Sequence, residues 1–220
     1  MATILITGAN RGIGLALTKQ FVARGDTVIA ACRTAGAELA ATGARVVEGI
    51  DVSDEASVRS LVEATRDERI DVLFANAGIL ERDTLDRLDL DGVRRQLAVN
   101  TLGPLIVVDA LKDRLGPNAK VALMTSRMGS VADNASGGYY GYRASKAELN
   151  AIGKSLAIDL KPKGVSVVLL HPGYVATDMV GGTGDVSPQQ AARQLIERLD
   201  ALTPEKSGTF QHANGSMLPW

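Results

Sequence analysis

The sequence predicts a single α/β domain built on one doubly wound parallel sheet. Strand-like and helix-like segments alternate along all 220 residues, and no linker, internal repeat or low-complexity tract divides residues 1–220. Strands that alternate with helices are joined by right-handed crossovers, which gives a parallel sheet with helices on both faces. A chain of this length with 45% hydrophobic residues can bury a sizeable core.

The expected strands are seven short apolar or β-branched runs, at residues 3–7, 27–31, 45–48, 71–75, 120–125, 165–170 and 209–212. Apolar residues at helical spacing predict helices over residues 13–24, 53–66, 92–114, 142–160 and 188–202. Pro104 lies inside the third helix and predicts a kink or a restart there. Either Ser53 or Asp54 caps the second helix, and residues 35–43 form a short helix or a loop. This is the pattern of a Rossmann fold.

Composition excludes several classes of function. The formal net charge is −1 and aromatic residues make up 4%, which argues against nucleic-acid binding. Cys32 is the only cysteine, so no intrachain disulfide can form. No stretch approaches the roughly 20 apolar residues of a membrane span, and the first residues lack a basic leader. We expect a cytoplasmic protein with no membrane partner and no metal site.

A glycine-rich loop follows the first expected strand and reads Thr-Gly-Ala-Asn-Arg-Gly-Ile-Gly over residues 7–14. Glycines let the backbone turn tightly and approach a pyrophosphate, and the helix N-terminus then offers free N–H groups to the anion. The alternative is a purely structural turn. We expect a dinucleotide contact from Gly8, Asn10, Arg11, Gly12, Ile13 and Gly14.

The end of the second strand favours NADP(H) over NAD(H). NAD-binding sites usually place a carboxylate there, whereas this chain has Ala-Ala-Cys-Arg, ending at Arg33. Arg33 and Arg11 could bind a 2′-phosphate bidentately, or could simply be solvated surface arginines. NAD(H) stays open as the second cofactor.

Three further polar positions follow the third and fourth strands. Asp51, followed by Val52, could accept a hydrogen bond from adenine or could instead cap a helix. In Asn76-Ala77-Gly78, Gly78 would allow close approach of the adenosine half. Asn76 could equally hydrogen-bond to the neighbouring strand and have no ligand role.

A tyrosine and a lysine four residues apart are the expected proton-transfer pair. Tyr142 and Lys146 share one face of a helix, whereas Tyr139 and Tyr140 have no such lysine. An ammonium beside a phenol favours the phenolate, so we expect Lys146 to lower the pKa of Tyr142. In isolation this spacing is common by chance.

With the glycine loop at 7–14, Asn-Ala-Gly at 76–78 and Tyr-x-x-x-Lys at 142–146 in this order, the chain resembles the short-chain dehydrogenase/reductase family over essentially its whole length. Asn100, Ser126 and the Pro-Gly of residues 172–173 add to the match. The segment Ser-Arg-Met-Gly-Ser at 126–130 and the C-terminal sequence resemble the subgroup of bacterial C-factor and small carbonyl reductases.

The resemblance implies a role for each matched residue. Tyr142 would be the general acid in reduction and the base in oxidation, and Lys146 would bind the nicotinamide ribose. Ser126 would hydrogen-bond to the substrate oxygen, and Asn100 would hold a water that links Lys146 to solvent. A set at the sixth strand would hold the carboxamide and phosphate side of the cofactor: Pro172, Gly173, Val175 and Thr177.

The chain departs from the family pattern at two places. Ala75 replaces the first asparagine of the frequent Asn-Asn-Ala-Gly. The interval from Ser126 to Tyr142 is longer than usual, which we assign to a polar insertion at residues 133–138. Ser130 is therefore a rival for the catalytic serine, although Ser126 follows the fifth strand directly.

The substrate side is expected around a short glycine-rich lid at residues 176–186. Four apolar side chains are candidates to line it: Met128, Met179, Val180 and Trp220. His171 is interpreted as a structural histidine with its hydrogen bonds satisfied.

The predicted function is hydride transfer between NADP(H) and a small or medium carbonyl or alcohol substrate. The alternative is a cofactor-binding signalling or regulatory protein of C-factor type with little turnover. The long helices at 92–114 and 142–160 suggest a homodimer, because relatives commonly associate through them.

Overall fold

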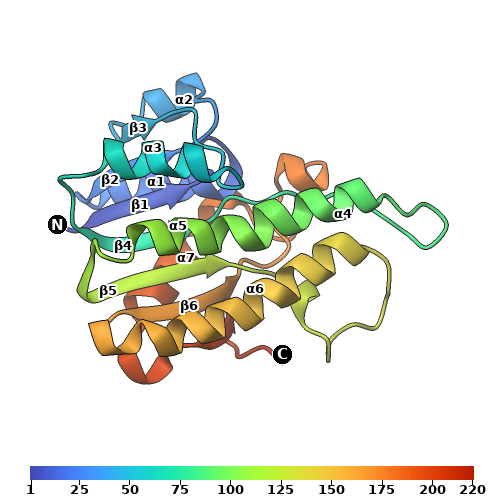
Figure 1. The fold of residues 1–220 in the computed structure, drawn as a ribbon. Coiled ribbons are helices and arrows are strands. Elements are labelled where there is room, and N and C mark those ends of the chain that lie inside the picture. Colours follow the sequence, from blue (N-terminus) through green and yellow to red (C-terminus); the bar gives the residue numbers. More distant parts are fainter.

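The computed structural model describes all residues from Met1 to Trp220, and it confirms the predicted fold class. Seven parallel strands run in the order β3-β2-β1-β4-β5-β6-β7 (Figure 1). The strands are β1 (Thr3–Thr7), β2 (Thr27–Ala31), β3 (Arg45–Val47), β4 (Ile70–Ala75), β5 (Leu115–Met124), β6 (Ser166–His171) and β7 (Thr209–His212).

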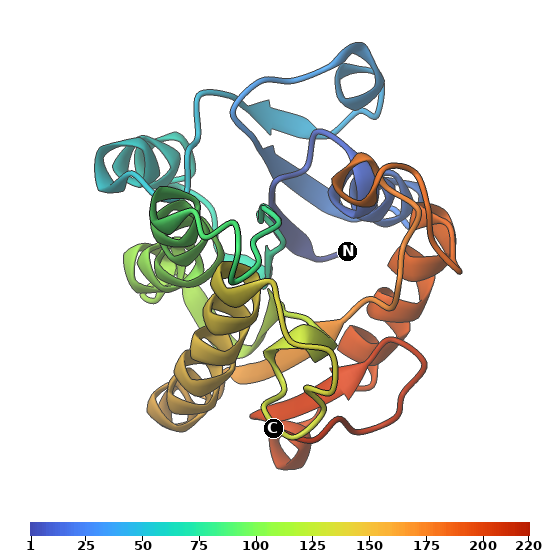
Figure 2. The same cartoon turned by 90° about the vertical axis from the view of Figure 1, so that its right-hand side faces the viewer.

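Helices cover both faces of this sheet (Figure 2). One layer holds α3 (Glu55–Ala64), α4 (Leu90–Leu97), α5 (Gly103–Leu111) and α6 (Tyr140–Asp159). The other holds α1 (Gly12–Ala23) and α7 (Pro188–Asp200), while the short α2 (Ala37–Ala40) lies beside the β2–β3 edge.

Alternating side chains along the strands build a separate core under each layer. In β1, Leu5 packs into a cluster of 25 buried residues on the α3/α5/α6 side. Ile4 and Ile6 point the other way, into a cluster of 21 residues with Leu17 and Leu195 of α1 and α7. Because both faces are covered, the strands are apolar on both sides, as expected for parallel sheets.

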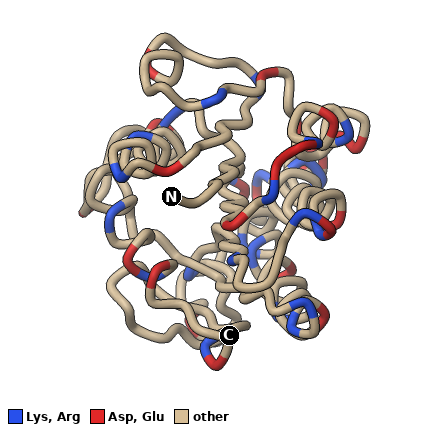
Figure 3. Tube along the Cα trace, turned by 90° about the vertical axis from the view of Figure 1, so that its left-hand side faces the viewer, with Lys and Arg blue, Asp and Glu red and all other residues tan.

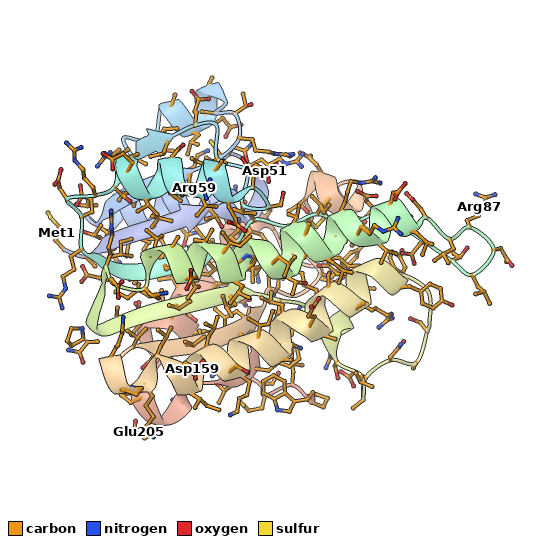
Figure 4. The ribbon with its side chains drawn as sticks, viewed as in Figure 1. Met1, Asp51, Arg59, Arg87, Asp159 and Glu205 are labelled. Carbon is orange, nitrogen blue, oxygen red and sulfur yellow. The ribbon has the colours of Figure 1, made fainter.

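The strand order reverses between β1 and β4, so loops diverge there and leave a crevice at the carboxyl ends of the strands. The carboxyl ends of the strands lie on the right-hand side in Figure 1. Asp51 and Arg87 lie toward that end in Figure 4, whereas Met1 and Glu205 lie at the opposite end.

The predicted helix over residues 92–114 is instead three segments. A π-helical turn at Ala98–Leu102 separates α4 from α5. Pro104 lies in the first turn of α5 and has no N–H to donate to the carbonyl of Asn100 four residues earlier. The wider π turn lets the helix continue past this break, and Asn100 lies inside it.

Other expected boundaries hold with small changes. β5 starts earlier than predicted, at Leu115, because its register on β4 shifts between Ile70 and Val72. The short α2 falls in the segment expected to be a helix or a loop.

Charges of both signs are intermixed over the molecule, as the tube in Figure 3 shows from the amino-terminal end of the strands. None of the helices combines the length and the apolar character that crossing a bilayer requires.

Candidate active site

One cavity of about 1020 Å³ opens at the carboxyl ends of the strands. Every residue assigned a catalytic or cofactor-binding role in the sequence lines it except Asn100. The structure thus brings together the glycine loop, the ends of β2 to β6, and the pair on α6. Predicted residues in the lining are Gly8, Asn10, Arg11, Gly12, Ile13, Gly14, Arg33, Asp51, Val52, Asn76, Ala77, Gly78, Ser126, Tyr142, Lys146, Pro172, Gly173, Val175 and Thr177.

The glycine loop is held tightly against the loop after β4. Gly8 has φ +65°, and a Cβ there would lie 2.8 Å from the Ala77 Cα. A Cβ on Gly14 would lie 2.6 Å from Asn76 Nδ2. These glycines are therefore required for backbone packing, and they set the position of the start of α1.

The N-terminus of α1 has no side-chain cap. Arg11 occupies the N-cap position without a side-chain hydrogen bond to the first turn, and that turn carries no acidic residue. The first-turn N–H groups therefore remain available to an anion in the cavity, where the helix dipole also favours negative charge.

Asn76 shows the strand-linking role that was one of its two interpretations. Its Nδ2 donates to the carbonyls of Thr7 at 3.0 Å and Gly8 at 3.1 Å. The Thr7 hydroxyl in turn accepts from the N–H groups of Asn76 and Ala77. Asn76 thus fixes the β1 and β4 loops to each other, and it also lines the cavity.

Asp51 is not a helix cap. The cap of α3 is Asp54, whose carboxylate accepts from the N–H groups of Ala56 and Ser57. Asp51 instead lines the cavity and accepts from the Ser53 hydroxyl at 2.6 Å. That hydrogen bond, aided by the charge of Arg33, lowers the pKa of Asp51.

Two arginines that were predicted to bind a 2′-phosphate, Arg11 and Arg33, both line the cavity. Arg33 forms no ion pair, and Thr34 beside it also lines the cavity. Arg11 lies 3.9 Å from Asp178 of the lid, with both side chains largely exposed, so this pair is weak. Both guanidinium groups can reorient toward a phosphate.

Tyr142, Lys146 and Ser126 line the cavity together and are all buried. Tyr142 lies in the first turn of α6 and Lys146 one turn later. Ser126 begins a 3-10 turn after β5, and that turn is pressed against α6: a Cβ on Gly129 would lie 2.6 Å from the carbonyl carbon of Lys146. Gly129 thereby brings the serine loop up to the tyrosine helix.

The pKa of Tyr142 moves opposite to the prediction. Burial raises it to about 12, and the nearby Ser126 hydroxyl opposes that rise. Lys146 does not offset it, because its Nζ donates to the Met124 carbonyl at 2.8 Å and lies 5.8 Å from the centre of the Tyr142 ring. Burial lowers the pKa of Lys146 to about 7, so at neutral pH its charge is only partly present.

Asn100 lies behind the cavity wall. Its Oδ1 accepts from the Ile79 N–H at 2.8 Å, and its Nδ2 donates to the Ile79 carbonyl and to Ser145 Oγ. The side chain therefore links the loop after β4 to α6, and its polar atoms bond to Ile79 and Ser145 and not to Lys146. The expected water link would have to use another atom of Asn100.

Ser130 and Trp220 do not line the cavity. The Ser130 hydroxyl donates to the Trp220 carbonyl at 3.2 Å and accepts from the Asp133 N–H. The Trp220 ring packs on Phe210, with ring centres 5.6 Å apart. Of the two candidate serines, only Ser126 lines the cavity, and Met128, Met179 and Val180 line it as expected.

His171 is not the satisfied structural histidine that was predicted. It lines the cavity, and its buried Nδ1 has no hydrogen-bond partner. Burial, with His212 and Arg127 nearby, lowers its pKa to about 3. His212 and Arg127 also line the cavity and were missed, because only the pairing of β6 with β7 brings the histidines together.

Asp83 is a further residue that the sequence did not reveal. It is buried, and its carboxylate accepts from the backbone N–H groups of Tyr140 and Gly141 at the start of α6. Its own carbonyl accepts from the Tyr139 N–H. Asp83 thus fixes the first turn of α6 from the distant loop after β4. No local pattern signals a cap that is 57 residues away.

The residues present fit a nicotinamide dinucleotide. The start of α1 is uncapped, Arg33 lines the cavity after β2, and Arg11 lines it at the start of α1. A Cβ on Gly78 would lie 3.2 Å from Asn100 Oδ1 and 3.7 Å from Lys146 Nζ, so glycine keeps the space in front of Lys146 open.

Comparisons with known proteins agree with this geometry. The family model described as short chain dehydrogenase matches residues 2–188. The 1-hydroxy-2-glutathionyl-2-methyl-3-butene dehydrogenase of Rhodococcus sp. is 46% identical and is covered completely, as is this chain. The C-signal protein of Myxococcus xanthus is 42% identical over 154 residues, which are 69% of this chain and 93% of that protein.

Solved structures lead to the same family. The carbonyl reductase Sniffer of D. melanogaster has a TM-score of 0.90 at 30% identity, with both chains covered in full. An NADPH-bound carbonyl reductase from chicken fatty liver has a TM-score of 0.89 at 28% identity, with 100% of this chain and 99% of that chain covered. The chain is an oxidoreductase by type and belongs to the short-chain dehydrogenase/reductase family.

Proposed function

We propose that this protein transfers a hydride between NADP(H) and a small or medium carbonyl or alcohol substrate, with Tyr142 as the general acid and base. The observation that carries the proposal is the meeting of Ser126, Tyr142 and Lys146 in the cavity that the glycine loop also lines. When bound, the nicotinamide supplies the hydride acceptor or donor, so the protein needs only to orient the substrate and move a proton.

The cofactor would be held along the β1, β2 and β4 loops. The uncapped start of α1 would take the pyrophosphate, and Arg33 with Arg11 would take the 2′-phosphate. Asp51 and Val52 would flank the adenine, and Gly78 would leave room in front of Lys146 instead of beside the adenosine half, where it was expected. Lys146 would hold the nicotinamide ribose, and the segment 172–177 would hold the carboxamide side.

The raised pKa of Tyr142 suits the reductive direction. A phenol with a pKa of about 12 stays protonated through neutral pH, so it can donate a proton to a developing alkoxide. The Ser126 hydroxyl would hydrogen-bond to the same oxygen. Oxidation needs the phenolate, so its rate should rise as the pH rises toward the pKa of Tyr142.

NADPH oxidation against a panel of aldehydes and ketones tests the proposal. We expect turnover by the wild type and a loss of kcat/KM of about 10²–10⁴-fold in Tyr142→Phe. Tyr140→Phe is the matched control, because Tyr140 is exposed two residues earlier on the same helix. Equal activity of wild type and Tyr142→Phe on the best substrate would refute the catalytic assignment.

A second reaction is favoured by the full-length relative from Rhodococcus. That protein is named for the oxidation of an alcohol bearing a glutathionyl group. We therefore include glutathione-conjugated alcohols with NADP+ and NAD+ in the panel. Turnover of these conjugates alone would make the protein an alcohol dehydrogenase of thioether substrates.

The regulatory alternative rests on the similarity to C-signal. A binding protein would not require a buried Ser126, Tyr142 and Lys146 set around one cavity. Tight NADPH binding with no turnover of any substrate in the panel would favour this alternative. A homodimer through α4, α5 and α6 stays a prediction, which size-exclusion chromatography with light scattering tests.

A further inference from the structure

Two histidines stand side by side at the β6–β7 end of the cavity. His171 and His212 are register partners at the carboxyl ends of their strands, and both line the cavity. Their rings are 5.0 Å apart between centres and 79° apart in angle, which is an edge-to-face arrangement. Neither ring has a role in the proposed proton transfer.

The surroundings of Nδ1 indicate which ring nitrogen carries the proton in each histidine. His212 Nδ1 accepts from the Asn214 N–H at 3.0 Å, so the neutral ring carries its proton on Nε2. His171 Nδ1 is buried without an acceptor, so its proton is better placed on Nε2 as well. Burial lowers the pKa of both rings, which keeps them neutral at pH 7.

Arg127 stands next to Ser126 and adds a positive charge at the same end. Its Nε pairs with Asp133 at 2.9 Å, and the two terminal nitrogens form no bond to the protein. A guanidinium held by one edge presents its free nitrogens as a fork for a carboxylate. Asp185 of the lid also lines the cavity, but it pairs with neither histidine nor with Arg127.

We propose that Arg127, His171 and His212 form a subsite for a carboxylate carried by the substrate. Arg127 and the two Nε2–H groups are donors, and the one acceptor nitrogen without a partner, His171 Nδ1, is buried, so the donors match an acceptor-only anion. Because Ser126 follows β5 and the histidines end β6 and β7, the carboxylate would lie one to two strand spacings, about 5–10 Å, from the reacting carbon. This rests on the proposed function and names its substrate class: keto acids or hydroxy acids whose two groups are several bonds apart.

A matched substrate series tests the subsite with the full chain and NADPH. Methyl ketones with a terminal carboxylate and two to six intervening methylenes are compared with their methyl esters. We expect the wild type to prefer the acid by about tenfold or more in kcat/KM at the best length, which is the effect of a hydrogen bond to a charged group. Arg127→Gln should abolish this preference, and Arg127→Lys should keep part of it.

Arg94→Gln is the control, because Arg94 is exposed on α4 and does not line the cavity. This variant should keep the full preference for the acid. Should Arg127→Gln fail to fold, His212→Leu serves in its place, with a smaller loss of preference. Equal kcat/KM for acid and ester in the wild type, or an unchanged preference in Arg127→Gln, would overturn the subsite, while ester turnover would still support the proposed function.

Binding without turnover keeps the two proposals distinct. Calorimetry of hexanoate with the wild type and with Arg127→Gln measures the subsite alone. We expect the affinity to fall by about tenfold or more in the variant. If no ketone turned over but hexanoate bound with this difference, the subsite would hold and the proposed function would fail. Equal or absent hexanoate binding in both proteins would overturn the subsite.

Discussion

The two halves of the cavity are built from different materials. In the half formed by β1, β2 and β4, the loops are held together by backbone contacts: Gly8 and Gly14 allow approaches that any Cβ would prevent. In the half formed by β5, β6 and β7, the wall is side chains such as Ser126, His171 and His212. A backbone wall suits a constant ligand, whereas a side-chain wall can change with the substrate, so substitutions in the first half should act on cofactor binding and those in the second half on substrate turnover.

Ser126→Ala tests the side-chain half most strongly. Removing the hydroxyl that would bind the substrate oxygen should lower kcat/KM by about 10²–10³-fold with NADPH affinity retained. Ser130→Ala is the comparison variant, since Ser130 bonds to Trp220 instead of lining the cavity. The fold-loss of kcat/KM in Ser130→Ala should be less than a tenth of that in Ser126→Ala. Its Tm should fall by roughly 2–4 °C. The reverse result in steady-state kinetics would make Ser130 the catalytic serine.

Gly14→Ala tests the backbone half. Its Cβ would collide with the Gly8 carbonyl and with Asn76 Nδ2, so the glycine loop must shift. A misplacement on the order of 1 Å at such a site lowers the reaction rate by about 10²-fold. We expect kcat/KM with NADPH to fall by that factor, and the Kd for NADPH, measured by fluorescence titration, to rise. Gly36→Ala is the control, because nothing lies within 4 Å of a Cβ there. Unchanged NADPH affinity in Gly14→Ala would show that this half is not a backbone wall.

Arg33→Ala sharpens the assignment of the adenosine end. Loss of a charge-assisted contact to the 2′-phosphate should lower kcat/KM for NADPH by about 10–100-fold and leave that for NADH nearly unchanged. Arg11→Ala should have a smaller effect, since Arg11 has Asp178 nearby as a competing partner. An equal loss for both cofactors would mean that Arg33 does not read the phosphate, and a wild-type preference for NADH would overturn the NADP(H) assignment.

Lys146 links the cavity to stability through pH. Its pKa is about 7 in the fold against 10.5 for an ordinary lysine, so between these values the unfolded chain binds more protons. The free energy of unfolding of the wild type should therefore rise as the pH increases from 7 to 10.5. Below pH 7 the full destabilisation caused by burying Lys146 should be present. Between pH 7 and pH 9, the Tm of the wild type should rise by a few degrees relative to the Tm of Lys146→Met. Parallel curves would show that Lys146 is not buried as a destabilised cation.

Local patterns predicted what depends on backbone geometry. The glycine loop, the strand ends and the face shared by Tyr142 and Lys146 all follow from spacing along the chain, and the structure gathers them in one cavity. The predicted direction of the shift in the Tyr142 pKa was wrong. Burial raises this pKa, and the Lys146 ammonium, which donates to the Met124 carbonyl, does not offset the rise. The π turn at Asn100 and the His171–His212 pair depend on packing between distant segments, which spacing does not encode.

The hydrogen bonds of Asp83 couple the movement of the loop after β4 to the first turn of α6. Tyr140 and Gly141 donate their amides to a carboxylate carried by a loop that also lines the cavity through Leu80 and Arg82. Those two amides should therefore exchange with deuterium only when this loop lifts away. Their exchange rates would report how firmly an occupant of the cavity holds the loop closed, at two residues that do not line the cavity.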